Sequence, residues 1–167
     1  MLFTEYLNLL CLEMIHYYKG DARRIQHFIK VHSFARLIGE SEHLDEKTMQ
    51  VLEAAAYVHD IGIKPAEEKY GNCNGKLQEQ EGPAEAEKML TRLGFAEDLI
   101  KRVCYLVGHH HTYTNIEGLD YQILVEADFL VNLYEDQLSK ETAACVCQKI
   151  FRTETGKAIC KTMFDCE

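Results

Sequence analysis

Four ionisable residues stand where the sequence pattern of predicted helices calls for apolar side chains. They are His27, His59, Asp60 and Asp128. Imidazole nitrogens and carboxylate oxygens together suit divalent metals such as Mn²⁺, Fe²⁺, Co²⁺, Ni²⁺ and Zn²⁺, and they tolerate Mg²⁺. An ionised carboxylate on a buried face is unfavourable unless it is paired or bound to a cation. We therefore predict that these side chains hold one or two divalent metal ions.

His27 lies within the apolar stripe of a helix expected over residues 22–38. At about 100° per residue, Val31 and Ile38 fall within about 40° of His27. His59 and Asp60 close the next expected helix, over residues 45–59, after a run of three alanines. A single histidine on an apolar face is more often a hydrogen-bonded core residue, so His27 alone does not define a metal site.

Asp128 is the strongest local anomaly, because its helical neighbours Leu124, Val125 and Val131 are all apolar. A buried salt bridge or a cap for another helix would also explain a carboxylate at this place. The combination is more specific than any one residue. Inward-facing histidine and aspartate side chains from different helices can meet in the core of a bundle, where metal sites are commonly built.

Three consecutive histidines, 109–111, follow a helix expected over residues 96–107 and ended by Gly108. Imidazole is a common metal ligand, so His109 and His110 are further candidates. The alternative is a surface cluster near a helix C-terminus, where the helix dipole favours positive charge.

The periodicity predicts an all-α protein, a compact bundle of about six to eight helices without convincing strand alternation. Residues 60–80 carry several glycines and asparagines and are expected to form a long functional loop, with Gly82-Pro83 opening the following helix. We expect one domain over 1–167, with a motif-bearing core at about 20–135 and C-terminal helices at 139–165 packed on it. The other helices are expected at about 3–19, 22–38, 45–59, 96–107, 120–135, 140–151 and 155–164.

The formal net charge is −9, which disfavours long nucleic acids and anionic membranes as partners. No apolar run is long enough for a membrane span. The seven cysteines are odd in number and include no Cys-x-x-Cys pair, so we expect reduced thiols and a cytoplasmic location. A homodimer is compatible with the sequence, which does not define the oligomeric state.

These motifs resemble the HD-domain superfamily of metal-dependent phosphohydrolases. The resemblance rests on three segments and covers roughly residues 20–135: Arg24-Ile25-Gln26-His27 with Val31 and Ala35, Ala54-Ala55-Ala56-Tyr57-Val58-His59-Asp60-Ile61-Gly62, and Glu126-Ala127-Asp128-Phe129-Leu130. The histidine run is not followed by the glycine-tyrosine-proline signature of the cyclic-dinucleotide phosphodiesterase branch, which we disfavour.

The resemblance implies that His27, His59, Asp60 and Asp128 bind metal. Many relatives bind a second ion, for which His109 or His110 fits. A further histidine of those relatives is expected where this chain has Glu81, directly before Gly82-Pro83. Glu81 either replaces that ligand or stabilises the N-terminus of the helix through its dipole.

The function implied is hydrolysis of a small phosphate ester, with a nucleotide as the leading substrate. The ion would activate the attacking water and neutralise phosphoryl charge. Asp60 would ligate and bridge, and Lys64 would grip a phosphate oxygen unless it is an ordinary solvated lysine. The alternatives are a nucleotide-binding regulatory module without turnover and a di-iron oxygenase of the same fold.

Overall fold

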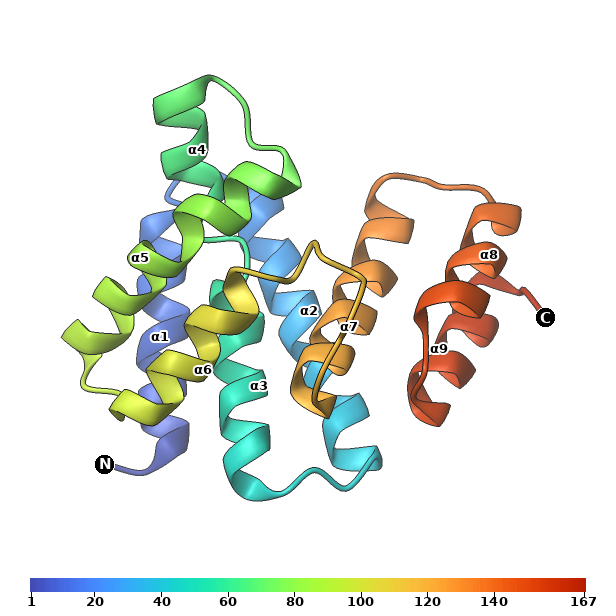
Figure 1. Ribbon diagram of the computed structural model, residues 1–167, viewed down its shortest axis with the longest axis horizontal. Coiled ribbons are helices and arrows are strands. Elements are labelled where there is room, and N and C mark those ends of the chain that lie inside the picture. Colours follow the sequence, from blue (N-terminus) through green and yellow to red (C-terminus); the bar gives the residue numbers. More distant parts are fainter.

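The computed structural model describes residues 1–167 as nine α-helices without a strand, which confirms the all-α prediction (Figure 1). No helix is long and apolar enough to cross a membrane. In chain order the helices are α1 (Phe3–Tyr17), α2 (Ala22–Ser41), α3 (Glu46–Val58), α4 (Ile63–Tyr70), α5 (Gly75–Leu93), α6 (Glu97–Val107), α7 (Leu119–Glu135), α8 (Lys140–Ile150) and α9 (Glu154–Phe164).

Short polar side chains set where several helices begin. The side chains of Asp21, Asp45 and Asn74 accept hydrogen bonds from backbone N–H groups in the first turns of α2, α3 and α5. Such caps satisfy amide groups that have no partner inside the helix. Gly94 ends α5 at φ 86°, a left-handed conformation that glycine adopts without steric cost.

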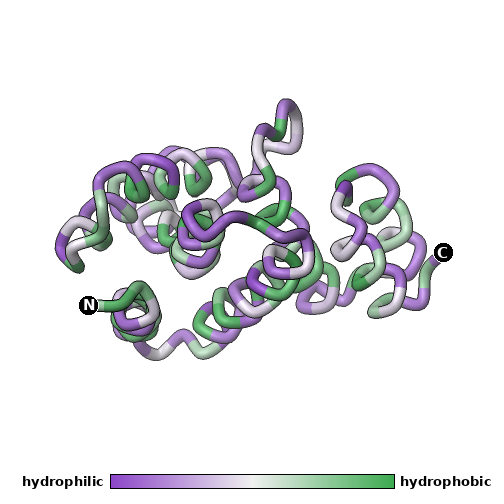
Figure 2. Tube along the Cα trace, turned by 90° about the horizontal axis from the view of Figure 1, so that it is seen from below, coloured by the Kyte–Doolittle hydropathy of each residue, from purple (hydrophilic) through white to green (hydrophobic).

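Helix α3 occupies the centre of the bundle and packs against α1, α2, α6 and α7. Its Ala54, Ala55 and Ala56 are fully buried, and their small side chains allow the neighbouring helices to approach closely. In Figure 2 hydrophobic and hydrophilic residues alternate along the helices, as expected for amphipathic helices around one core. The central position of α3 places its C-terminal end, and therefore His59 and Asp60, deep in the molecule.

The predicted loop over residues 60–80 is wrong, because this segment contains α4 and the first turns of α5. Pro65 is the third residue of α4. Proline is tolerated there because the N–H groups of a first helical turn have no intrahelical partner in any case. This additional helix explains why the bundle has nine helices where six to eight were expected.

The predicted start of the following helix at Gly82-Pro83 is also wrong. Helix α5 begins at Gly75, and Pro83 lies inside it. An interior proline removes one backbone hydrogen bond, so tertiary packing must support this part of α5. The support comes from close contacts, since a Cβ on Gly82 would lie 2.6 Å from Val107 Cγ1 of α6.

The second helix was expected to end at residue 38, but α2 continues through Gly39 to Ser41. The glycine serves packing, because a Cβ at this position would lie 2.7 Å from Met49 Sδ of α3. The two helices are thereby held close together, which brings His27 of α2 towards the end of α3.

The C-terminal helices α8 and α9 are joined to α7 through a buried carboxylate. Glu126 accepts hydrogen bonds from the backbone N–H groups of Arg152 (2.5 Å) and Thr153 (2.9 Å) and from the Thr153 hydroxyl (2.6 Å). Phe151 and Cys160 belong to the same hydrophobic core as the central helices. The connection between α8 and α9 is therefore fixed to the helix that carries Asp128.

Candidate metal centre

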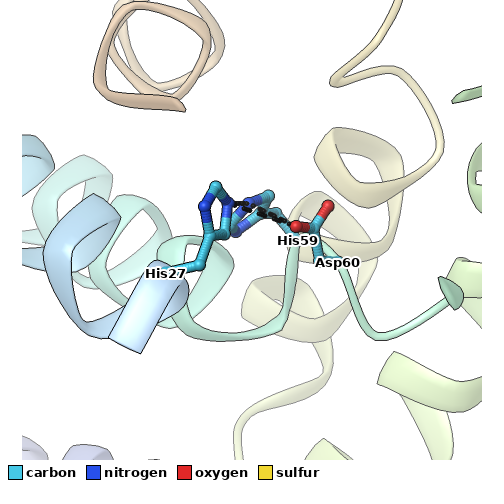
Figure 3. Close-up of side chains that lie close together, drawn as sticks. All are labelled: His27, His59 and Asp60. Atoms are coloured by element: carbon cyan, nitrogen blue, oxygen red, sulfur yellow. Dashed lines mark hydrogen bonds and ion pairs between the residues drawn. The ribbon is translucent and has the colours of Figure 1, made fainter. Parts of the chain in front are cut away.

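Three helices bring the four predicted ligand residues to one point (Figure 3, which draws His27, His59 and Asp60). His27 comes from α2, His59 and Asp60 from the C-terminal end of α3, and Asp128 from α7. His27 Nε2 lies 3.2 Å from His59 Nε2, 3.2 Å from Asp60 Oδ2 and 3.1 Å from Asp128 Oδ1. His59 Nε2 lies 3.3 Å and 3.4 Å from the same two carboxylate oxygens.

The backbone around Asp60 is held in place by two tyrosines and one glycine. The hydroxyl of Tyr18 donates to the Asp60 carbonyl oxygen at 2.7 Å, and that of Tyr17 donates to the Ile61 carbonyl oxygen at 3.2 Å. A Cβ on Gly62 would lie 2.4 Å from the Gln78 carbonyl oxygen, so only glycine lets this turn pass so close to α5.

A fifth side chain joins the cluster on the opposite side of Asp60. His110 follows α6, is 1% exposed, and places Nε2 3.2 Å from Asp60 Oδ1. Asp60 therefore directs Oδ2 towards His27 and His59 and Oδ1 towards His110. This is the arrangement of a carboxylate that can bridge two ions.

The hydrogen bonds of the three histidines leave only acceptor atoms facing the centre. His59 Nδ1 lies 2.8 Å from the Ala56 carbonyl oxygen, and His110 Nδ1 lies 2.9 Å from the Val107 carbonyl oxygen. A carbonyl can only accept, so Nδ1 donates and Nε2 of the neutral ring carries a lone pair. His27 Nδ1 lies 3.3 Å from the Glu135 carboxylate, which also only accepts, so Nδ1 of His27 donates and its Nε2 carries the lone pair.

This donor set fits a divalent cation. Ligand bonds of about 2.0–2.2 Å imply distances of about 3.0–3.6 Å between neighbouring ligand atoms, which is the range observed around His27 and His59. Converging lone pairs and carboxylates repel one another unless a cation or protons lie between them. The mixture of imidazole and carboxylate favours a first-row metal, and no cysteine belongs to the cluster.

Without metal, protons must compensate the two carboxylates. Burial disfavours the charged form of His27, but hydrogen bonds to Asp128 and Asp60 outweigh burial and raise the pKa of His27 to about 9. The pKa of His59 is raised well above its usual value although burial opposes this, because Asp60 and Asp128 lie beside it. Burial acts against ionisation of Asp128, and its histidine neighbours nevertheless lower its pKa. Metal binding at neutral pH must therefore displace protons.

Glu135 orients His27, as a second layer of side chains around a metal often does. Its Oε1 atom lies 3.3 Å from His27 Nδ1 and 2.9 Å from Lys30 Nζ. His59 and His110 are oriented by backbone carbonyls instead. His27 is thus the one histidine of the three whose non-ligating nitrogen faces a negative charge.

Fewer side-chain atoms are free to bind an ion on the side of Asp60 that faces His110. Asp60, His110 and His111 each offer one atom within 4.8 Å of the others. However, His111 Nε2 lies 3.0 Å from Gln78 Oε1, and Gln78 Nε2 in turn donates to the Cys73 carbonyl oxygen at 2.7 Å. His111 Nε2 must therefore donate to the amide oxygen. The lone pair of the neutral ring is then on Nδ1, which faces the Tyr113 hydroxyl at 3.4 Å.

Three predicted site residues lie outside the cluster. His109 stacks on Tyr105, with ring centroids 4.1 Å apart, and its Nδ1 lies 2.7 Å from the Tyr105 carbonyl oxygen. Lys64 extends towards α1, where Nζ donates to the Tyr17 carbonyl oxygen at 3.3 Å. Glu81 pairs with Lys69 at 2.5 Å and accepts from the Tyr70 hydroxyl at 3.0 Å.

The position of Glu81 follows from the corrected start of α5. It was placed at a helix N-terminus, but it lies in the interior of α5 and turns towards α4. Gln78, one turn earlier on α5, is the residue that faces His111. Asn74 was the signal for the true helix start, since asparagine is a preferred N-cap. Glu135 gave no such signal, because a charged residue at a helix end is ordinary.

The family model described as HD domain matches residues 24–150, most of the chain. This protein belongs to the HD domain family. The HD-domain fold here also superposes, with a TM-score of 0.64 and 27% identity, on the crystal structure of a predicted HD superfamily hydrolase from an uncultured Thermotogales bacterium. That match covers 97% of this chain and 84% of the other chain.

No curated protein sequence resembles this HD-domain chain significantly. The predicted membership of the HD superfamily is confirmed by the family match and by the structural match. The His/Asp cluster of this HD domain is a group that could hold a metal ion. Neither comparison identifies the metal or a substrate.

Proposed function

We propose that this protein is a metal-dependent phosphohydrolase acting on a small phosphate ester, with a nucleotide as the leading substrate class. One observation carries the proposal. His27, His59, Asp60 and Asp128 converge with acceptor atoms only, and the opposite nitrogen of each histidine is fixed as a donor. Such a set favours binding of a divalent cation, which would replace the protons of the metal-free cluster, and the family to which the chain belongs supports hydrolysis as its use.

Each residue has a distinct task in this proposal. His27, His59, Asp128 and Asp60 Oδ2 hold a divalent ion, which when bound supplies Lewis-acid stabilisation of phosphoryl charge and lowers the pKa of the attacking water. Asp60 Oδ1 and His110 Nε2, 3.2 Å apart, remain as acceptors on the other side. They can hold the proton that leaves the water during in-line attack on phosphorus.

Two aromatic residues near the histidine run offer a surface to the substrate. Tyr113 and Phe129 pack with ring centroids 5.0 Å apart, and Phe129 directly follows Asp128. The Tyr113 hydroxyl lies 3.4 Å from His111 Nδ1. Such rings favour a substrate with a planar or apolar group beside its phosphate, which supports a nucleotide over inorganic phosphate compounds.

The test is phosphate release from a panel of monoesters, diesters and nucleotides. Protein treated with EDTA is assayed after addition of Mn²⁺, Co²⁺ or Mg²⁺. We expect turnover with at least one metal, and its loss in Asp128→Asn. If no compound is cleaved with any of the three metals, a regulatory nucleotide-binding role replaces this proposal. Iron-dependent visible absorption with O₂ consumption would instead support an oxygenase.

A further inference from the structure

A polar cavity of about 250 Å³ lies beside the metal centre, between the loop at residues 113–116, the start of α7 and the connection of α8 to α9. Tyr113 links the two places. Its side chain lines the cavity, and its hydroxyl lies 3.4 Å from His111 Nδ1. His111 in turn belongs to the group formed with Asp60 and His110. One tyrosine and one histidine thus connect the cavity to the cluster.

The cavity is bordered by two cations that have no acidic partner. The chain has six arginines, and five of them pair with carboxylates: Arg23, Arg24, Arg36, Arg92 and Arg102. Arg152 makes no such pair, and neither does Lys149; both line the cavity. Arg152 is therefore the one arginine of this chain without a carboxylate partner, and Lys149 adds a second positive charge at the same cavity.

Arg152 is held in position and still has donors to offer. Its guanidinium donates to the carbonyl oxygens of Phe151 at 2.9 Å and Lys149 at 2.7 Å, and its backbone N–H donates to the buried Glu126. A guanidinium has five N–H donors, so most remain for a ligand. The planar arrangement of these donors matches the oxygens of a phosphate group.

Gln122 adds an acceptor with a fixed direction. Its amide nitrogen donates to Glu126 Oε1 at 3.1 Å and to the Ile150 carbonyl oxygen at 2.9 Å. Its Oε1 atom makes no hydrogen bond within the protein and is free to accept from a hydroxyl of a ligand. Two cations and one acceptor together describe a site for a phosphate group attached to a hydroxylated carbon skeleton.

We propose that this cavity binds a second phosphate group of the substrate, one that is remote from the scissile phosphate at the metal centre. This rests on the proposed hydrolase function and narrows its substrate class to molecules with two separate phosphates. Tyr113 lines the cavity, and Phe129 packs on it with ring centroids 5.0 Å apart. These two rings would contact the part of the substrate that joins the two phosphates.

The first experiment compares hydrolysis of adenosine 3′,5′-bisphosphate with that of para-nitrophenyl phosphate, which has one phosphate. We expect the double variant Lys149→Gln/Arg152→Gln to lose at least about tenfold in kcat/KM for the bisphosphate, since it removes charge-assisted hydrogen bonds. Its kcat/KM for para-nitrophenyl phosphate should change by less than about twofold, since the metal centre is untouched. The control Lys140→Gln/Lys161→Gln removes the same charge outside the cavity and should affect neither substrate. Equal losses for both substrates, or no loss for either, would overturn the proposal.

The second experiment needs no turnover and separates this proposal from the hydrolase function. Equilibrium dialysis in EDTA measures binding of adenosine 3′,5′-bisphosphate and adenosine 5′-monophosphate. We expect the bisphosphate to bind more tightly to the native protein and this preference to disappear in the double variant. If the preference is found but nothing is hydrolysed, the cavity assignment stands and the hydrolase proposal fails. If the preference is absent, the cavity assignment fails whatever the enzyme hydrolyses. If the double variant does not fold because of Arg152→Gln, both tests are repeated with Lys149→Gln alone. The Lys149 side chain makes no hydrogen bond within the protein, so this substitution should not disturb folding.

Discussion

The two oxygens of Asp60 face two unlike environments. On the Oδ2 side, the Nε2 atoms of His27 and His59 lie 3.1–3.4 Å from the facing oxygens of Asp60 and Asp128. Both histidines are oriented through Nδ1, His59 by a backbone carbonyl and His27 by a carboxylate. On the Oδ1 side, His110 is prepared in the same way, but His111 Nε2 is engaged by Gln78.

This difference shows that a ligand-like residue type is not enough to make a ligand. The hydrogen bond on the second nitrogen of a histidine decides whether the first nitrogen carries a lone pair. We expect one tightly bound ion on the Oδ2 side, and weaker binding on the Oδ1 side unless His111 leaves Gln78.

The largest effect is expected from Asp60→Asn, because Asp60 is common to both sides. Removing its charge should lower metal affinity by more than about 100-fold, beyond the 10–100-fold typical of residues that only orient a ligand. The measurement is the amount of metal bound per protein chain after gel filtration, determined by mass spectrometry. Asp98→Asn, at an exposed ion pair with Lys47, is the matched control and should retain full metal content. Retention of metal by Asp60→Asn would remove Asp60 from the site.

Two neighbouring histidines test the Oδ1 side. His110→Ala should reduce turnover by at least about tenfold, because it removes the acceptor beside Asp60 Oδ1. His109→Ala should change turnover by less than about twofold, since His109 stacks on Tyr105 outside the cluster. The measurement is kcat of both variants and of the native protein on the best substrate among the phosphate esters and nucleotides tested. The opposite order of effects would mean that the turn after Gly108 has a different register in solution.

Glu135→Gln should weaken metal binding by about tenfold, since it removes the negative charge that faces His27 Nδ1 while keeping the side-chain shape. The neighbouring Asp136→Asn removes an equal charge that pairs with Arg23 on the surface, and should leave metal affinity unchanged. Titration with Co²⁺, followed by its visible absorption, reports both affinity and ligand geometry. An unchanged Co²⁺ affinity and spectrum in Glu135→Gln would mean that Glu135 only forms ion pairs with Lys30 and Arg23 and has no role at the metal.

The pH dependence of stability should differ between metal-free and metal-loaded protein. The folded-state pKa of His27 is about 9, above its ordinary value of 6.5. The corresponding stabilisation is fully present below pH 6.5 and is lost as the pH rises through 9. Tm in EDTA should therefore fall between pH 6.5 and 9, whereas saturating Mn²⁺ should largely prevent the fall because the ion replaces the protons. Parallel curves with and without metal would argue against protons in the cluster.

The smallest effect is expected from Glu81→Gln. The carboxylate pairs with Lys69 and Tyr70 between α5 and α4, so its loss should lower Tm slightly and leave metal content unchanged. A clear loss of metal would show that Glu81 turns towards Asp60 when the ion is bound, as the resemblance to related sequences suggested. Glu85→Gln, one turn further along α5 and without an ion pair, is the control.

The sequence could predict that the residues on the Oδ2 side converge, because the expected boundaries of the helices concerned were nearly right. When the limits of a helix are known, its periodicity shows which side chains face inwards, and His27 and Asp128 were identified in this way. The Oδ1 side depends on features without periodicity. The turn after Gly108 sends His109 outwards and His110 inwards, and no pattern of residue types encodes that choice.

The start of α5 was the main error, and it moved attention from Gln78 to Glu81. Proline is far more common at the first position of a helix than inside one, so Pro83 outweighed the asparagine cap nine residues earlier. The packing of Gly82 on Val107 and Gly62, which supports the interior proline, exists only in the folded molecule. Long-range contacts of this kind cannot be read from local sequence.

The most direct test of the metal centre is anomalous diffraction from crystals grown with Mn²⁺. We expect an anomalous peak within about 2.0–2.4 Å of His27 Nε2, His59 Nε2, Asp60 Oδ2 and Asp128 Oδ1, with Nδ1 of His59 still bonded to the Ala56 carbonyl oxygen. A protein crystallised with excess Mn²⁺ that shows no peak between these four atoms, while their side chains keep their positions, would contradict it.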